Sequence, residues 1–331
     1  MTLKKDSSGF YKKKPVKAII ITGPTASGKT SVSLRVVEKV TGEILCCDSM
    51  QVYKRMDIGT AKATAEEQRQ VSHHLIDLVE PWEEFSVADY CQAAELAVAD
   101  VSSKGKMPIF VGGTGLYVTS LVEGYSYESE YQSDAGLNTE LSQMAMSQEG
   151  IEELYRFLCE KDPEAAAKIH IHNTKRLVRA VELYKLTGKK QKERNLESKR
   201  AGSFLNAEVF AIDLDRPVLY ERINLRVDEM LKDGLVEEVE NILRVCKNKG
   251  VSISRTAAQA IGYKEPIAYL QGRLNKEEMS DKIKSATRKY AKRQITWLRK
   301  WPWVKWIRPT GTMDAYQMIM SHLSENTDNF S

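Results

Sequence analysis

The sequence has no long hydrophobic segment and few cysteines, and each absence excludes a class of protein. No apolar run approaches the roughly 18 residues that a membrane-spanning helix requires. The lysine-rich residues 1–14 are not followed by the apolar segment of a secretory signal. The five cysteines are odd in number and lack metal-ligand spacing, which argues against a disulfide scaffold or a zinc fold. We therefore expect a globular, cytoplasmic protein with no membrane segment.

The sequence also has little net charge, and that charge lies in one place. Of 331 residues, 42% are hydrophobic and 28% are charged, which suits a globular protein of about two domains. The formal net charge of +4 belongs to residues 1–14, where five lysines face Asp6, so that residues 15–331 sum to zero. We predict that residues 1–14 form a disordered basic tail. Any argument for a polyanionic partner must come from where the charges lie.

Strands that alternate with helices predict an α/β core. Residues 16–22 have the pattern of a buried strand, a turn-rich segment follows, and residues 30–40 have helical periodicity. Further strands are predicted at 43–47 and 108–111, with a helix at 86–104 between them. This order is typical of a parallel sheet with helices on both faces.

A change of composition near residue 123 predicts an inserted helical subdomain over 123–204. Residues 123–164 hold eleven acids against only Arg156 and Lys161, and helical patterns continue to Leu186. A buried strand at 208–213 then returns the chain to the sheet. The core therefore comprises 15–122 and 205–331, its last part containing helices expected at 217–232, 235–247, 264–270 and 276–300 and a strand at 304–307.

A phosphate-binding loop joins the first core strand to the first helix. The segment satisfies G-x-x-x-x-G-K-[ST] in the required strand–loop–helix context, and we expect all its members to bind phosphate: Gly23, Pro24, Thr25, Ala26, Ser27, Gly28, Lys29 and Thr30. Its backbone N–H groups and the helix N-terminus would hold the anion, Lys29 would add a full charge, and the Thr30 hydroxyl would bind Mg²⁺. The core thus resembles a P-loop NTPase, although a pyrophosphate ester would satisfy the same groups as ATP.

A carboxylate is expected beside such a loop at the end of a buried strand, and here it follows the second strand rather than the third. Strand 108–111 ends in Gly-Gly-Thr-Gly without an acid, whereas strand 43–47 is followed by Asp48. Because ligands in open α/β sheets lie at the carboxyl ends of strands, we expect Asp48, Gln51 and Thr114 to converge beside the loop. Asp48 is then either a second ligand of Mg²⁺ or a general base, and a turn-forming or helix-capping role is the structural alternative.

Two other pairs of residues suggest metal or redox chemistry but are better explained by structure. Adjacent side chains on an extended segment point to opposite sides, so His73 and His74 are not expected to share a metal ion. Cys46 and Cys47 lie at a strand end and are expected to be packing residues.

Positive charge is concentrated in two segments. The first basic strip, 173–200, holds ten Lys or Arg against three Glu, and the second basic strip, 282–300, holds eight and no acid. Such segregation is typical of a surface that binds a polyanion. Aromatic residues occur in and beside the second strip and could stack on unpaired RNA bases: Tyr290, Trp297, Trp301 and Trp303. A solvated helix face with core tryptophans is the alternative for either strip alone.

Eight motifs occur in the order found in one known family. They are GPTASGKT (23–30), CCDSMQVYKRMDIGTAK (46–62), HHLID (73–77), FSVADY (85–90), GGTGLY (112–117), KRLVRAVE (175–182), AIGYKE (260–265) and RKYAKRQITWLRK (288–300). On these motifs the chain, from about residue 15 to 308, resembles the bacterial tRNA dimethylallyltransferases. DSMQVY together with GGTGLY separates this family from nucleoside and shikimate kinases. Cys46 and Cys47 depart from the small residues that are common in the family before the Asp-Ser pair.

The resemblance implies a prenyl transfer to RNA. The donor would be dimethylallyl pyrophosphate, whose pyrophosphate would occupy the P-loop with Mg²⁺ as cofactor. The acceptor would be N6 of adenosine 37 in the anticodon loop of tRNAs that read codons beginning with U, and the enzyme would be a monomer. The target base would have to leave the stacked loop and enter a channel.

The resemblance also implies roles for individual residues. Asp48 would accept the proton of the adenine amine, Thr114 would lie at the reaction centre, and Gln51 would hold the adenine edge. Arg222 and Arg226 are candidates to reach the pyrophosphate, and Arg216 is a third. The segments expected to contact the tRNA anticodon stem-loop comprise Asp48, Ser49, Met50, Gln51, Lys175, Arg176, Leu177, Val178, Arg179, Gly262, Tyr263, Arg288, Lys289, Lys292 and Arg293.

Two other functions use the same features differently. A small-molecule or nucleoside kinase would use the P-loop with ATP and would leave the basic strips without a role. A nucleotide-gated RNA-binding protein without catalysis would leave Asp48 chemically idle. Prenyl transfer is distinguished from both by the mass that it adds to adenosine.

Overall fold

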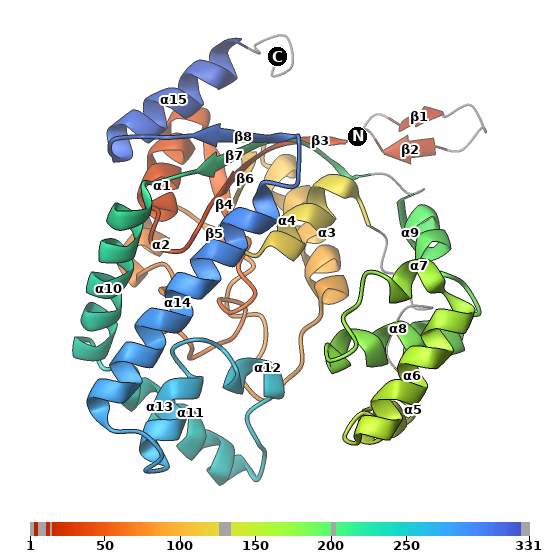
Figure 1. Ribbon diagram of the computed structural model, residues 1–331. Coiled ribbons are helices and arrows are strands. Elements are labelled where there is room, and N and C mark those ends of the chain that lie inside the picture. The colour runs from red at the N-terminus through yellow and green to blue at the C-terminus, as the bar shows by residue number, and fades with distance from the viewer. Residues whose placement is uncertain (1–2, 6–10, 14, 126–133, 200–202, 326–331) are drawn as a thin grey trace. The chain divides into compact units, whose positions relative to one another are not determined.

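The computed structural model describes residues 3–5, 11–13, 15–125, 134–199 and 203–325 (Figure 1). Its contacts divide the chain into two compact units, residues 1–122 with 204–331 and residues 123–203. The predicted helical insertion, 123–204, differs from the second unit by one residue.

A parallel sheet forms the centre of the first unit, as the alternation of strands and helices predicted. Its six strands are arranged in the order β5-β4-β6-β3-β7-β8, and every neighbouring pair is parallel. Their bounds are β3 (Val16–Thr22), β4 (Gly42–Cys46), β5 (His73–His74), β6 (Met107–Val111), β7 (Leu205–Ile212) and β8 (Val304–Ile307). The α/β fold class is confirmed. Because β6 is inserted between β3 and β4, a crevice is expected at the carboxyl ends of these strands.

The alternation of side chains along β3 explains how helices cover both faces. Ala18 and Ile20 pack in one buried cluster with α3 (Val87–Ser103) and α4 (Gly115–Glu123). Ile19 and Ile21 point the other way and pack in a second cluster with α1 (Lys29–Val40) and α15 (Thr312–Glu325). Burial on both faces is why β3 reads as a continuous apolar run.

Helix α15 lies outside the elements that the sequence predicted, although its apolar residues have helical spacing. Ala315, Ile319 and Leu323 recur at helical spacing and are buried in the cluster that includes α1. This helix lies after Pro309, beyond the motifs that carry the family resemblance. Helix α2 (Ala65–Gln70) and strand β5 were missed as well, since both are too short to show a period.

A third cluster joins the segment after β4 to the C-terminal helices. The helices of this part are α10 (Arg216–Lys232), α11 (Leu235–Lys249), α12 (Arg255–Ala258), α13 (Lys264–Leu270) and α14 (Lys276–Leu298). Val52, Tyr53 and Met56 are buried in one cluster with Val227 of α10 and Val239 of α11. The long segment between β4 and α2 is therefore packed against other elements, which gives it a defined shape.

The second unit is helical over its described residues, as predicted. Its helices are α5 (Ala135–Met144), α6 (Gln148–Lys161), α7 (Pro163–Ala166), α8 (Thr174–Thr187) and α9 (Gln191–Lys199). Leu141, Leu154, Leu158, Leu177 and Val181 form its separate apolar core. This unit can therefore bury an apolar core of its own.

The N-terminal tail contains a hairpin where the sequence predicted disorder. Strands β1 (Leu3–Lys5) and β2 (Tyr11–Lys13) pair in antiparallel fashion. Residues 1, 2, 6–10 and 14 lie outside the described part of the chain. Three-residue strands that pair with each other have little intrinsic stability. The alternation of apolar and polar residues that indicates a strand cannot be recognised in so short a segment.

All five cysteines are free thiols. Among the described residues, no helix combines the length and the hydrophobicity needed to cross a bilayer.

Candidate active site

The loop between β3 and α1 has the curled backbone that its glycines predict. Gly23 has a φ of 139°, and a Cβ atom at this position would lie 2.8 Å from the carbonyl oxygen of Ile212 at the end of β7. Gly28 has a φ of 88° and caps α1 in the left-handed region. Lys29 Nζ donates to the carbonyl oxygens of Gly23, at 3.1 Å, and Pro24, at 2.7 Å. The ammonium group thus lies over the loop, where a bound anion would meet it.

Positive charge converges on this loop from α10. Burial, together with the charge of Arg226, lowers the pKa of Lys29 to about 8, while the charge of Asp48 opposes the shift. Burial also lowers the pKa of Arg226. The guanidinium of Arg222 lies 3.9 Å from the position that a Cβ atom on Gly28 would take. By contrast, Arg216 donates to Tyr220 and stacks on its ring. Two cations that repel each other at a buried site favour the binding of an anion.

Asp48 follows β4 and lies beside these cations. Its Oδ1 accepts the backbone N–H of Met50 at 2.9 Å. Burial raises the pKa of the Asp48 carboxyl, and the Met50 N–H and the charges of Lys29 and Arg226 oppose that shift. A fixed carboxyl group of raised basicity is suited to accept a proton.

Thr114, after β6, is bonded to the segment that carries Asp48. Its hydroxyl oxygen accepts the backbone N–H of Ser49 at 2.9 Å, and its own N–H donates to the carbonyl of Cys47 at 3.2 Å. A Cβ atom on Gly112 would lie only 2.1 Å from the Cys47 carbonyl oxygen, so only glycine permits this approach of the two strand ends. The structure therefore brings Asp48 and Thr114 to neighbouring positions beside the P-loop.

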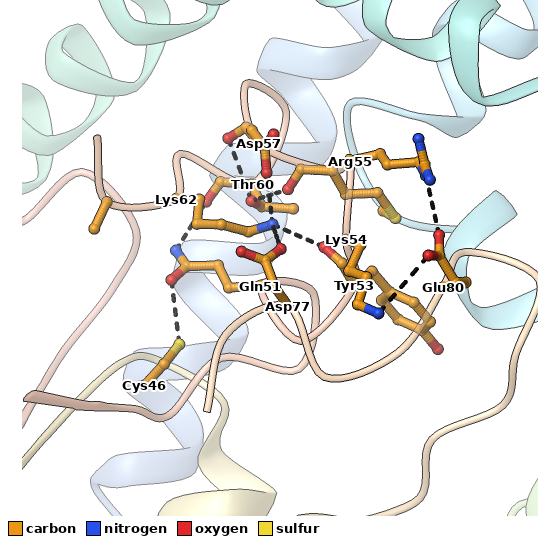
Figure 2. A network of polar contacts seen from close by, with 12 residues as sticks. Cys46, Gln51, Tyr53, Lys54, Arg55, Asp57, Thr60, Lys62, Asp77 and Glu80 are labelled. Carbon is orange, nitrogen blue, oxygen red and sulfur yellow. Dashed lines mark hydrogen bonds and ion pairs between the residues drawn. The ribbon is translucent and has the colours of Figure 1, made fainter. Parts of the chain in front are cut away.

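Gln51 lies in the same region, but its side chain is bonded within the protein (Figure 2). Its Nε2 donates to the carbonyls of Thr60 and Ala61 at 3.1 and 3.2 Å, and its Oε1 accepts from Cys46 Sγ at 3.2 Å. The expected contact with the adenine edge would require these bonds to be exchanged. Cys46 and Cys47 are buried, as expected of packing residues, and burial raises the pKa of both thiols.

One residue of the site that the sequence did not indicate is Gln294 on α14. Its Oε1 accepts the N–H of Thr25 in the P-loop at 2.9 Å, and its Nε2 donates to the carbonyl of Gly113 at 2.8 Å. One turn further along α14, Trp297 packs so closely on Gly115 that a Cβ atom there would lie 2.4 Å from the ring. Gln294 lies inside the segment RKYAKRQITWLRK (288–300), whose many basic residues suggest RNA binding and give no indication of a contact with the P-loop. It joins the P-loop to the loop that carries Thr114.

Two adjoining cavities meet at Asp48. The first, of about 840 Å³, is lined by the P-loop and by Asp48, Arg222 and Arg226. The second, of about 280 Å³, shares Asp48 and Arg226 with the first and has a more apolar wall. Its further lining includes Met50, Ile223, Val227, Gly262, Ile283 and Tyr290. An anion site and a more apolar chamber thus share one carboxylate.

The basic residues of the second strip have different surroundings. Lys289, Lys292 and Arg293 are exposed, whereas Arg288 donates to Asn224 on α10 at 2.6 Å. Lys289 and Arg293 line a further cavity of about 670 Å³ together with Lys264, Arg273 and Lys282.

The tryptophans near the second basic strip pack against the protein. The indole N–H of Trp297 donates to Thr119, and Trp301 and Trp303 stack on each other against the core. These contacts agree with tryptophans that pack against the protein core and not with tryptophans that stack on RNA bases.

The first basic strip lies on α8 and α9 of the second unit. Lys175 and Arg176 are exposed, and Arg179 forms an ion pair with the buried Glu182 at 2.9 Å. The side chains of Leu177 and Val178 are buried in the core of this unit, so these two residues cannot present side chains to RNA as expected. A helix must bury one face, and the motif spans both faces. Arg200, at the end of the strip, lies outside the described residues.

Of the two residues before α13 that are expected to contact RNA, one lines a cavity and the other has a buried side chain. Gly262 has a φ of 85° and lines the 280 Å³ cavity. Tyr263 is 1% exposed, and its hydroxyl donates to Glu238 of α11 at 2.6 Å. The Tyr263 side chain is thus inside the protein, which conflicts with its expected contact with RNA.

Nothing in the described residues favours a metal site at the histidines. His73 Nδ1 bonds to the Val71 carbonyl and His74 Nε2 to Glu43, so the two rings have different partners, as expected. Glu43, His74 and Asp100 offer ligand atoms within 4.8 Å of one another. However, Lys106 pairs with Glu43 at 2.7 Å and Lys104 pairs with Asp100 at 2.6 Å. Lysine ammonium groups already balance these carboxylates, so the cluster does not fit a cation.

Comparison with known proteins identifies relatives over most of the chain. Residues 51–301 match the family model described as IPP transferase. The chain is 45% identical over 296 residues to the tRNA dimethylallyltransferase of Thermoanaerobacter sp. strain X514, covering 88% of this chain and 91% of the relative.

Solved structures agree with the sequence relatives. The tRNA isopentenylpyrophosphate transferase of Bacillus halodurans is 38% identical, with a TM-score of 0.67 over 95% of this chain and 99% of that one. A eukaryotic dimethylallyltransferase acting on tRNA is 27% identical, with a TM-score of 0.80 over 95% and 80% of the two chains.

Proposed function

The chain belongs to the IPP transferase family, and from this we propose that it transfers a dimethylallyl group from dimethylallyl pyrophosphate to N6 of adenosine 37 in tRNA. The observation that carries the proposal is the pair of cavities that meet at Asp48. One offers cations and a P-loop to a pyrophosphate, and the other offers a more apolar chamber to an alkyl chain and a base. The products would be N6-isopentenyladenosine and pyrophosphate.

The P-loop side of the site would hold and stabilise the leaving pyrophosphate. Lys29 and the loop N–H groups would bind its oxygens, and Arg222 and Arg226 would approach from α10. Negative charge grows on the bridging oxygen as the allylic C–O bond breaks, and preorganised donors and cations stabilise that charge without reorganisation. Pro24, Thr25, Ala26 and Ser27 would contribute through the shape and the N–H groups of the loop.

The Asp48 side of the site would activate the acceptor. The N6 amine is a weak nucleophile because its lone pair is delocalised into the purine ring. As N6 forms its bond to the allylic carbon, one N6 proton would pass to the Asp48 carboxylate, whose raised pKa favours this transfer. Thr114 would hold the segment after Asp48 in place through the Ser49 N–H.

The residues present fit Mg²⁺ as the cofactor. The Thr30 hydroxyl and the Asp48 carboxylate line the same cavity and are oxygen donors of the kind that Mg²⁺ prefers. Mg²⁺ would be held by Thr30, with remaining positions filled by pyrophosphate and water, and Asp48 is either its second ligand or the base. When bound, the ion would neutralise charge on the pyrophosphate.

The RNA would be bound by exposed basic residues of both units. Lys289, Lys292 and Arg293 of α14 and Lys175 and Arg176 of α8 are exposed cations suited to phosphate contacts. The target base would leave the anticodon loop and enter the 280 Å³ cavity next to Ser49, Met50 and Gly262. We further propose a cytoplasmic monomer that acts on tRNAs reading codons beginning with U.

A mass measurement tests the proposed function. The protein is incubated with Mg²⁺, dimethylallyl pyrophosphate and unmodified tRNA, and the nucleosides are analysed by mass spectrometry. We expect an isopentenyl increment on one adenosine beside the anticodon. Transfer of phosphate from ATP to a small acceptor, with no change in the tRNA, would instead establish the kinase alternative.

A further inference from the structure

A carboxylate on α11 binds a turn of the segment between β4 and α2. The Oε2 of Glu238 accepts the backbone N–H groups of Asp57, at 3.0 Å, and Ile58, at 2.8 Å, and its Oε1 accepts that of Gly59 at 3.3 Å. Three successive N–H groups directed at one carboxylate make charge-assisted hydrogen bonds, which are stronger than bonds between neutral groups. The position of this turn is therefore determined by a residue about 180 positions away in the chain.

Tyr263 completes the arrangement from the other side. Its hydroxyl donates to Glu238 Oε1 at 2.6 Å, and its side chain is almost wholly buried. Its ring packs on the turn so closely that a Cβ atom on Gly59 would lie 2.5 Å from it. Glu238 and Tyr263 thus hold Gly59 between them, and we call this pair the turn clamp.

The residues that follow the clamped turn are hydrogen-bonded to the side chain of Gln51. The carbonyls of Thr60 and Ala61, which follow the clamped residues, accept both bonds from Gln51 Nε2 (Figure 2). The buried Lys62, which follows Ala61, binds Asp57 at the start of the turn and also Asp77, at 2.6 Å each. The turn, Gln51 and Lys62 therefore form one connected polar network.

The same turn forms a wall of the chamber beside Asp48. Gly59, Thr60 and Ala61 line the 280 Å³ cavity together with Gly262, the residue before Tyr263. A shift of the turn would change the width of this chamber without touching the P-loop or its lysine. Gly59 lines the chamber and not the 840 Å³ cavity, whereas its neighbours Asp57 and Ile58 line the 840 Å³ cavity. A change at Gly59 should therefore affect the acceptor base more than the pyrophosphate donor.

We propose that Glu238 and Tyr263 are positioning residues that fix the width of the chamber receiving the acceptor base. Neither residue touches the reacting atoms. Tyr263 acts through Glu238 rather than by contact with RNA, and Glu238 acts through the turn 57–59. The inference rests on the proposed function in taking the chamber as the site of the base, whereas the clamp itself is a property of the fold.

Hydrogen exchange tests the clamp independently of any activity. In the full-length protein, Glu238→Gln should speed exchange of the amides of residues 57–59 by about tenfold or more, because a neutral amide offers one acceptor and a weaker bond. Exchange in the P-loop should be unchanged. Glu237→Gln, at the exposed neighbouring position, is the matched control. Unchanged protection of 57–59 in Glu238→Gln would overturn the clamp, whatever the protein's activity.

Kinetics test what the clamp does. Tyr263→Phe keeps the ring and removes only the hydroxyl, so it should fold normally. We expect kcat/KM for an anticodon stem-loop to fall about three- to tenfold in Tyr263→Phe and further in Glu238→Gln, with a clearly smaller change in KM for dimethylallyl pyrophosphate. The double variant should lose no more than Glu238→Gln alone, because both residues act through one carboxylate.

The outcomes separate this proposal from its rivals. If Tyr263 stacked on an RNA base, Tyr263→Phe would retain activity, and that result would overturn the proposal. Equal rises in KM for both substrates would also overturn it, because they would indicate a general structural effect. If the unmodified protein transferred no prenyl group to RNA, the proposed function would fail, while the exchange experiment would still decide whether the clamp exists.

Discussion

Asp48 lines both cavities and Lys29 lines the P-loop cavity, and burial shifts the pKa values of these two residues in opposite directions. Burial raises the pKa of the carboxyl and lowers that of the ammonium. A base of raised pKa and a cation of lowered pKa are both poised nearer to neutrality than their ordinary values. The same burial that excludes water therefore prepares both groups for their proposed roles.

Replacing Asp48 should separate chemistry from binding. Asp48→Asn keeps the shape of the side chain and its bond to Met50 but removes the proton acceptor. We expect kcat to fall about 10²- to 10⁴-fold while the affinity for an anticodon stem-loop stays within about twofold. Single-turnover rates and RNA-binding titrations measure the two quantities, with Asp100→Asn on α3 as control. A normal rate in Asp48→Asn would remove Asp48 as the base.

The pH dependence of kcat/KM for the donor should have two limbs. On the acid side, activity falls as pH drops through the raised pKa of Asp48, because the protonated carboxyl cannot accept a proton. On the basic side, activity falls as pH rises through about 8, because Lys29 loses its charge. Lys29→Arg keeps its charge to a higher pH, so its remaining activity should lack the limb near pH 8. Persistence of that limb would assign it to another group.

Among the secondary-structure elements, α14 has two faces with different roles. One face carries Gln294 and Trp297, which contact the loops around Thr25 and Gly115. The other carries the exposed Lys289 and Lys292, and the exposed Arg293 lies at the border between the two faces, where it also lines the 280 Å³ cavity. One rigid helix therefore connects the P-loop with a surface suited to RNA.

Gln294 should affect the donor more than the RNA. Gln294→Met fills nearly the same volume but leaves the Thr25 N–H and the Gly113 carbonyl without their partner. Since an unpaired buried polar group costs about 1–3 kcal/mol, we expect KM for dimethylallyl pyrophosphate to rise about tenfold. Gln271→Met, at an exposed position, serves as control. Steady-state kinetics with each substrate varied in turn would contradict the prediction if only the RNA parameters changed.

In the whole molecule, charge placement matters more than net charge. Outside the basic strips and the tail, acids are in excess, so exposed cations on α8 and α14 stand out against an acidic background. A polyanion senses local potential and releases counterions where cations cluster. The formal charge of the chain would not reveal this.

Removal of the exposed cations of α14 should weaken RNA binding in a salt-dependent way. In the triple variant Lys289→Ala, Lys292→Ala and Arg293→Ala, we expect lower affinity for an anticodon stem-loop. The slope of log affinity against log salt should decrease by about two to three. Binding titrations at several salt concentrations measure the slope, and Lys276→Ala at the far end of α14 is the control. An unaltered slope would identify these residues as a solvated helix face.

Local features were well predicted by spacing and residue type. Strand β3 and helix α13 have the predicted bounds, and the P-loop adopts the curl that Gly23 and Gly28 require. These features depend on interactions between residues close in sequence. Spacing did not show which motif side chains are buried, as at Leu177 and Val178, where the motif spans both faces of a helix, or at Tyr263, which bonds to a distant helix.

The sequence by itself determined the α/β order, the P-loop, the concentration of basic residues and the family. Only the tertiary structure decided that Gln294 joins two loops of the site, that Gln51 is bonded within the protein, and that Glu238 and Tyr263 hold the wall of the chamber. Backbone propensity and short motifs act over a few residues, so they can be read along the chain. Which side chain meets which loop depends on the packing of helices that are distant in sequence, and no local pattern contains that information.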